Sequence, residues 1–329
     1  MRPFLYDQAA SARDAARAAG GEPAAAFIAG GTTLLDLMKL DVLRPERLID
    51  ITGIGEDGIE STAQGLRLGG MARMADVAAH EEVRRDYPVI AEALDLAASQ
   101  QLRNMARLGG NLLQRTRCPY FRDPSWSACN RRVPGSGCAA LEGVNRQHAV
   151  LGTSDACIAT YPGDLAQALV ALDATLDIVG PDGARTMPVA ELHRLPDARP
   201  EVETTLAPGE IITAIDVPAG PWTRRSLYLK IRDRESYAFA LASAAVALDI
   251  ADGVVREARI GLGGVATIPW RARAAEAELK GRPLDEASAG SAAEAAFASA
   301  RPRRHNAFKV ELGRRTLVRA LLQAATMEA

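Results

Sequence analysis

Four cysteines, all within one polar stretch of the chain, are the residues whose type and spacing suggest chemistry most directly. No C-x-x-C pair occurs among them, so the spacing is not that of a zinc ribbon. The surrounding residues 115–160 are rich in Arg, Pro, Ser and Asn and lack a sustained apolar period, so no apolar core of their own would order them. Thiols confined to such a segment indicate a metal site or disulfides. They follow the pattern C-x10-C-x8-C-x18-C: Cys118, Cys129, Cys138 and Cys157.

The composition of the same segment favours an iron–sulfur cluster. It holds six arginines and only three acidic residues, and this excess of positive charge could offset the negative charge of a cluster bound by four thiolates. Disulfides would need an oxidising compartment. Zinc and unliganded thiols remain the alternatives that the spacing leaves open.

Two diglycine turns indicate phosphate binding. The first, Ala29–Leu34 (AGGTTL), lies between an expected strand and an expected helix, where uncovered backbone N–H groups and the helix N-terminus favour a pyrophosphate. The second, Leu108–Gln114 (LGGNLLQ), carries an amide side chain beside its glycines. Either turn alone could simply connect a strand to a helix. Together they suit a dinucleotide held between two lobes.

Other common motifs are absent or poorly placed. The chain has no GxxxxGK[ST] sequence, and its four histidines form no HxxxH or HExxH pair. The segment Gly261–Ala266 matches G-x-G-x-x-A, but Pro269 would obstruct the helix that should follow. We therefore interpret this match as a sheet and turn feature.

The pattern of apolar residues predicts alternating helices and strands on both sides of the cysteine segment. Pro218–Pro221 is the best linker candidate. We expect helices over residues 7–19, 32–43, 74–85, 89–104 and 165–172, strands over 24–29, 47–51, 65–69, 175–179, 226–231, 243–250 and 254–262, and an alanine-rich helical region up to the C-terminus.

Composition excludes several classes of partner. The chain has 48% hydrophobic and 24% charged residues, which is typical of a globular protein. A net charge of −2 and 5% aromatic residues predict no nucleic-acid partner, and no apolar stretch is long enough to span a membrane. Met1–Gln8 contain no signal sequence. We expect a cytoplasmic protein, or a periplasmic one exported together with a signal-bearing partner.

Blocks of distinctive sequence occur in a fixed order outside the cysteine segment. Together they resemble the FAD subunit of the xanthine dehydrogenase, aldehyde oxidase and carbon monoxide dehydrogenase superfamily. In relatives a Pro-x-x-Asp-Leu sequence soon follows the second diglycine, whereas here the corresponding segment, Tyr161–Leu165 (YPGDL), is displaced by the insertion 115–160. The run NLLQRTRCPYFR is similar to that of the bacterial aldehyde oxidoreductases whose flavin subunit carries a [4Fe–4S] cluster. The blocks are Ala29–Leu40, Pro45–Ile51, Arg103–Asn111, Leu229–Ala238 and Arg259–Arg271.

The resemblance implies an α+β fold: a two-lobed FAD-binding domain of the p-cresol methylhydroxylase type, followed by a C-terminal α+β domain. It places the first domain at residues 1–220, with a lobe boundary near residue 52, and the second at 221–329. The implied cofactors are FAD and a [4Fe–4S] cluster held by the cysteines. The residues expected around FAD are Phe27, Ile28, Ala29, Gly30, Gly31, Thr32, Thr33, Leu34, Arg107, Gly109, Gly110, Asn111, Asp164 and Lys230.

Some of these roles carry their own alternatives. Asp164 would accept hydrogen bonds from FAD hydroxyls, although it could also cap the helix that follows. Lys230 would lie at the flavin edge, or simply on the surface beside a strand. Arg107 stands where many relatives have Ser or Thr, which puts a hydroxyl contact with FAD in doubt.

The resemblance also implies how the chain works. It would transfer electrons within a heterotrimer that contains a large molybdopterin subunit and a small [2Fe–2S] subunit, and it would contribute no catalytic acid or base. The alternatives are a self-sufficient FAD oxidase and a non-enzymatic, zinc-stabilised interaction module. Iron and flavin content would distinguish them.

Overall fold

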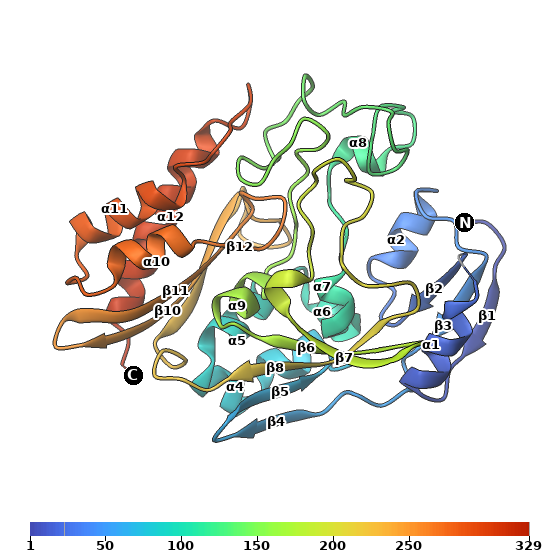
Figure 1. Ribbon diagram of the computed structural model, residues 1–329, viewed down its shortest axis with the longest axis horizontal. Coiled ribbons are helices and arrows are strands. Elements are labelled where there is room, and N and C mark those ends of the chain that lie inside the picture. Colours follow the sequence, from blue (N-terminus) through green and yellow to red (C-terminus); the bar gives the residue numbers. More distant parts are fainter. Residues whose placement is uncertain (23, 329) are drawn as a thin grey trace.

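The N-terminal lobe is a small parallel sheet with two helices. In the computed structural model, which describes residues 1–22 and 24–328, its strands lie in the order β1-β3-β2 (Figure 1). One face of α1 is alanine at helical spacing and is buried, while Ser11 caps its N-terminus by accepting from the Asp14 N–H at 3.1 Å. The elements are β1 (Leu5–Gln8), α1 (Ala12–Gly20), β2 (Ala25–Ile28), α2 (Leu34–Lys39) and β3 (Arg47–Asp50).

The second lobe is a five-stranded antiparallel sheet with the strand order β4-β5-β8-β6-β7. β8 lies at the centre of the sheet, between β5, which precedes the cysteine segment, and β6, which follows it. The strands are β4 (Ile59–Thr62), β5 (Gly65–Gly69), β6 (Thr175–Gly180), β7 (Gly183–Pro188) and β8 (Ile211–Pro218). The helices are α3 (Met74–Ala79), α4 (Glu81–Asp86), α5 (Pro88–Asp95), α6 (Gln100–Met105), α7 (Leu108–Leu112) and α9 (Leu165–Ala171), with a short turn of helix at Val189–Glu191.

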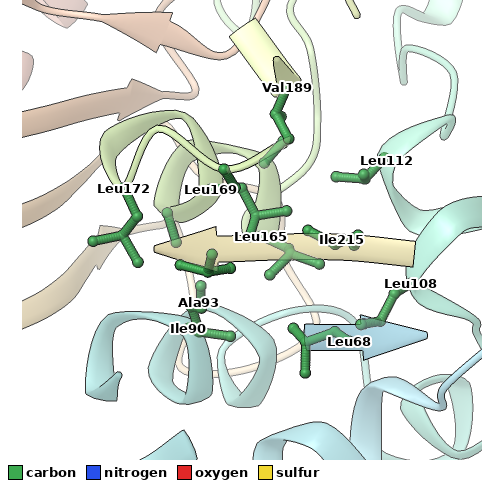
Figure 2. Packing of buried hydrophobic residues seen from close by; sticks show 14 of the residues in the cluster. Leu68, Ile90, Ala93, Leu108, Leu112, Leu165, Leu169, Leu172, Val189 and Ile215 are labelled. Carbon is green, nitrogen blue, oxygen red and sulfur yellow. The ribbon is translucent and has the colours of Figure 1, made fainter. Parts of the chain in front are cut away.

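The main hydrophobic core lies between this sheet and its helices. In Figure 2, Leu165 and Leu169 of α9 lie close to Ile215 of β8, with Leu68 of β5 below them. Every residue of α9 is buried, as expected for a helix whose residues are apolar except for Gln167. Because each fully buried Leu or Ile contributes about 1.5–3 kcal/mol, this core fixes the position of α9 and of the residues just before it.

The C-terminal domain is a four-stranded antiparallel sheet covered on one face by three helices (Figure 1). Side chains of β10 alternate between two cores: Ala245 and Ala247 join the core of the second lobe, while Val246 and Leu248 face the C-terminal helices. No helix among the described residues has the length and apolar character needed to cross a bilayer. The elements are β9 (Ser226–Ile231), β10 (Ala242–Ala251), β11 (Val254–Gly263), β12 (Trp270–Arg271), α10 (Arg273–Leu279), α11 (Glu286–Ala296) and α12 (Phe308–Ala325).

The expected α+β fold is confirmed, but several expected helices were too long. Residues 7–19 contain the end of β1 as well as α1, and the strand was missed because its side chains are all exposed and show no alternation in burial. The helix expected over 32–43 is only α2, since the chain turns at Asp41, whose φ is 57°. The two helices expected over 74–104 are four, partly because Pro88 keeps Tyr87 out of helical geometry.

The insertion 115–160 has almost no regular structure. Its one helix is the four-residue α8 (Pro119–Arg122), as the polar composition predicted. As also expected, Gly261–Ala266 belongs to the end of β11 and the turn after it, where Gly264 has a φ of 70°.

Candidate functional site

A cavity of about 720 Å³ lies where the two lobes, the insertion and the C-terminal domain meet. This volume is within the usual range for sites that enclose a large organic ligand. The lining comes from both glycine turns, from the start of the insertion, from the residues before α9 and from the loop after β9. It includes Thr32, Thr33, Asp36, Gly110, Asn111, Arg117, Cys118, His148, Asp164, Tyr237 and Phe239.

The first glycine turn is shaped by close backbone contacts. A Cβ added at Gly30 would lie 2.0 Å from the carbonyl oxygen of Met105, so only glycine lets this turn approach the segment before α7. Gly31 has a φ of 70°, which also favours glycine. These constraints turn the chain so that Thr32 and Thr33 line the cavity.

The second glycine turn has one packed and one open glycine. Gly109 lies against the carbonyl oxygens of Gly70 and Ile212, each 3.3 Å from an added Cβ. Nothing lies within 4 Å of a Cβ added at Gly110, which lines the cavity beside Asn111. The Asn111 side-chain oxygen is buried without a hydrogen-bond partner. A ligand in the cavity could therefore donate a hydrogen bond to the Asn111 oxygen and approach the uncovered backbone at Gly110.

The expected flavin residues other than Arg107 and Lys230, which do not line the cavity, fall into two groups. Thr32, Thr33, Gly110, Asn111 and Asp164 line the cavity. Residues 27–31, Leu34 and Gly109 form the structure behind it, in β2, the first turn, α2 and α7. α2 has only six residues, so the helix dipole would contribute less to phosphate binding than the sequence suggested.

Asp164 is the centre of a buried polar network rather than a helix cap. Its carboxylate accepts from the Tyr228 hydroxyl at 2.7 Å and from Lys230 Nζ at 2.8 Å, and it makes no capping bond to α9. Lys230 Nζ also donates to the Leu96 carbonyl oxygen at 2.9 Å, and its side chain is 1% exposed. The surface alternative for Lys230 and the capping alternative for Asp164 are therefore both wrong.

Arg107 also serves the scaffold. Its Nη1 donates to the carbonyl oxygen of Met71 at 3.0 Å. Burial, together with the nearby positive charge of Arg73, lowers the pKa of Arg107. The side chain thus ties the second turn to the chain before α3.

The four cysteines lie around one small cavity beneath α8. Cys129 and Cys138 pair as an isolated antiparallel bridge, and all four thiols are free of disulfide bonds. Cys118 lines this cavity and the large one as well. The fold therefore brings the four thiols together around one cavity.

Polar groups around the thiols suit bound thiolates. Arg131 Nε donates to Cys157 Sγ at 3.3 Å, and the Ala159 N–H donates to the same sulfur at 3.4 Å. The Cys138 thiol and Arg131 lower the pKa of Cys157, whereas burial raises that of Cys118 to about 12. His148 Nε2 lies 3.2 Å from Cys118 Sγ. A buried thiol beside such donors fits a metal site, because metal binding displaces the thiol proton and the donors stabilise the thiolate.

The arrangement does not converge on a single ion. Across residues 1–22 and 24–328, no three His, Cys, Asp or Glu side chains are placed to hold one metal ion. A cubane cluster binds one thiolate at each iron, so its ligands surround a volume instead of a point.

Sequence reasoning missed several residues at the large cavity. Tyr237 and Phe239 follow β9 in a loop, and Tyr237 has a φ of 52°, an unusual value of the kind that recurs at functional sites. Asp36 and Arg117 meet there from α2 and the insertion. Only the Tyr–Ala–Phe run after β9 could have drawn attention beforehand, since exposed aromatic residues in a loop suit a planar ligand.

Comparison with known protein families identifies the class of protein to which this fold belongs, that of flavin-binding subunits. The FAD-binding domain of molybdopterin dehydrogenases matches residues 2–220, and the C-terminal domain of CO dehydrogenase flavoproteins matches residues 227–324. The chain therefore belongs to the FAD-binding family of molybdopterin dehydrogenases.

Individual proteins agree with this assignment. The aldehyde oxidoreductase FAD-binding subunit PaoB of Escherichia coli (strain K12) is 49% identical, over 98% of this chain and 99% of that protein. The carbon monoxide dehydrogenase medium chain of Afipia carboxidovorans is 28% identical, over 79% of this chain and 73% of that protein. The solved structure of reconstituted CO dehydrogenase from Oligotropha carboxidovorans has a TM-score of 0.78 at 25% identity and covers both chains completely.

Proposed function

We propose that this chain is the FAD-binding electron-transfer subunit of a molybdenum-dependent aldehyde oxidoreductase. The observation that carries the proposal is the large cavity lined by both glycine turns and Asp164, in a chain that is 49% identical to an aldehyde oxidoreductase FAD-binding subunit. FAD would supply the redox chemistry. The chain would bind and orient it and connect the [2Fe–2S] centres of a small partner to an electron acceptor.

Three groups of residues would hold FAD. Thr32, Thr33 and the backbone at Gly110 would meet the pyrophosphate, and Asn111 would use its unpaired side-chain oxygen. Asp164 has acceptor capacity left beyond Tyr228 and Lys230 and would accept from flavin hydroxyls. Lys230 would act through Asp164, by holding this buried carboxylate in place with its hydrogen bond.

The cysteine segment would hold a [4Fe–4S] cluster. Support comes from the four thiols around one cavity and from the N–H groups of Arg131 and Ala159 that point at Cys157. The division into domains at 1–220 and 221–329, with lobes meeting near residue 52, is part of the same proposal. It is supported by the two family models, which match residues 2–220 and 227–324 separately.

The proposal requires partners, namely a large molybdopterin subunit and a small [2Fe–2S] subunit. In this proposal the chain supplies no acid–base pair for aldehyde oxidation, and the large subunit carries out the hydroxylation. We therefore expect the purified chain to bind FAD but to oxidise no aldehyde, with activity appearing only in the complex. Assays with aromatic and aliphatic aldehydes and an artificial dye test this expectation. Robust turnover by the chain alone would favour the self-sufficient oxidase instead.

A further inference from the structure

Arg117 of the insertion reaches the large cavity next to the turn that carries Thr32 and Thr33. Its Nη1 donates to Asp36 Oδ2 at 2.8 Å, and Asp36 lies in α2 directly after that turn. The Arg117 side chain is 25% exposed, so it forms part of the wall rather than of the outer surface. The insertion thus contributes a charged side chain to the expected pyrophosphate end of the cavity.

Positive charge is in excess where Arg117 meets Asp36. Arg122 donates to the same Asp36 carboxylate, at 2.8 and 2.9 Å, so two guanidinium groups share one negative charge. Arg117 Nε is buried and has no hydrogen-bond partner. A buried donor left unpaired is costly, and an anion in the cavity would satisfy both this donor and the excess charge.

Arg117 also reaches the C-terminal domain. Its guanidinium carbon lies 5.0 Å from the centre of the Phe239 ring, a cation–π geometry. The side chain therefore bridges α2, the insertion and the loop after β9, three parts of the chain that are far apart in sequence.

The neighbouring residue belongs to both cavities. Cys118 lines the large cavity and the cysteine cavity, and His148, whose Nε2 is 3.2 Å from Cys118 Sγ, lines the large cavity too. A metal bound to Cys118 would fix the backbone from which Arg117 projects. Without it, this part of an irregular segment has few apolar contacts to hold it: Cys118 packs only at the edge of two small clusters around Phe121 and Tyr120.

We propose that Arg117 is an FAD-binding residue supplied by the insertion, and that a loaded four-thiolate site keeps it in place, so that FAD affinity depends on cluster occupancy. This inference rests on the proposed function. It assigns the cluster a role in holding the flavin, whether or not electrons pass through it. Coupling between two binding sites of this kind commonly changes affinity five- to about 150-fold.

The test is a thermodynamic cycle on the complete chain. FAD affinity is measured by fluorescence titration of the flavin-stripped protein, with the cluster present and after its oxidative removal, for the original chain and for Arg117→Met. We expect cluster removal to weaken FAD binding of the original chain at least about tenfold. We expect Arg117→Met to weaken it by a similar factor with the cluster intact, and cluster removal to have little further effect in that variant.

A matched control keeps folding defects apart from the predicted effect. Arg44→Met removes an exposed guanidinium that pairs with Asp41 at 2.8 Å near α2, so it should keep both normal FAD affinity and the full effect of cluster removal. Iron content and thermal stability of each variant show whether it is folded and loaded. A loaded Arg117→Met protein with unchanged FAD affinity, or an original chain that binds FAD equally well without its cluster, would overturn the inference but leave the proposed function standing. A chain that never acquires iron would overturn the cluster itself.

Discussion

The large cavity and the cysteine segment are adjacent but are stabilised in different ways. The cavity is walled by the ends of helices and strands that the main hydrophobic core holds in place. The cysteine segment has only α8 as regular structure. Apart from Val150 and Leu151, which join the core of the C-terminal domain, its apolar contacts are two small clusters around Phe121 and Tyr120. Apolar burial therefore shapes the first site before any ligand arrives, whereas the second depends on polar contacts and on whatever its thiols bind.

Removing the ligand of the thiols should have the largest effect. Cys129→Ser should lose iron and disorder residues 115–160, because those residues have no substantial core of their own. Hydrogen exchange should become fast throughout the segment, while α9 stays protected. Val133→Ala, at a position that is 53% exposed in the same segment, is the control and should keep its iron. Full iron and unchanged protection in Cys129→Ser would contradict the contrast between the two regions.

The cavity should instead be sensitive to its buried ion pair. Lys230→Met removes the partner of Asp164 and leaves a carboxylate that is 4% exposed without its counter-charge. Breaking a buried pair from one side costs about 3–5 kcal/mol, to be measured by urea denaturation of the flavin-free chain. Lys280→Met, on the surface, should change stability by less than about 0.5 kcal/mol. A loss below about 1 kcal/mol at Lys230 would mean that the pair does not organise the cavity.

Acid should destabilise the folded chain through the buried side chain of His193. His193 is buried against Tyr161, and burial lowers its pKa to about 4. The unfolded chain takes up this proton near pH 6.5 while the folded chain does not, so stability should fall as the pH drops from about 6.5 to 4, by about 3 kcal/mol. His193→Gln, which can still donate to the Leu112 carbonyl oxygen, should remove this part of the pH dependence. An identical pH profile in the variant would refute the assignment.

The smallest predicted effect concerns two open glycines. A Cβ at Gly21 or at Gly110 meets nothing within 4 Å, but only Gly110 lines the cavity. Gly110→Ala should fold normally and weaken FAD binding about tenfold, since the methyl group would cover backbone that meets the ligand. Gly21→Ala should bind FAD normally. Equal affinities in the two variants would show that FAD does not approach this turn.

The sequence predicted the parts of the fold that depend on local pattern. The strands 226–231, 243–250 and 254–262 and the buried helix 165–172 lie close to where apolar periodicity put them. Helix ends were less predictable, because turns such as that at Asp41 depend on backbone geometry that no residue pattern reveals.

The candidate site shows the same limit. The glycine turns and the cysteines were recognisable from spacing, because glycine and thiols carry their chemistry in their residue type. The pairing of Asp164 with Tyr228 and Lys230, and the meeting of Arg117 with Asp36, join residues from distant parts of the chain. Tertiary packing alone brings them together, so the sequence could suggest Asp164 but not its partners.

The composition of the purified chain tests the central claim most directly. After anaerobic purification, iron, acid-labile sulfide, zinc and FAD should be counted per chain, and the absorption and electron paramagnetic resonance spectra recorded. A [4Fe–4S] flavoprotein predicts about four iron, four sulfide and one FAD, with a paramagnetic signal on reduction that disappears in Cys129→Ser. Zinc in place of iron, or a colourless chain that takes up no FAD, would contradict the account.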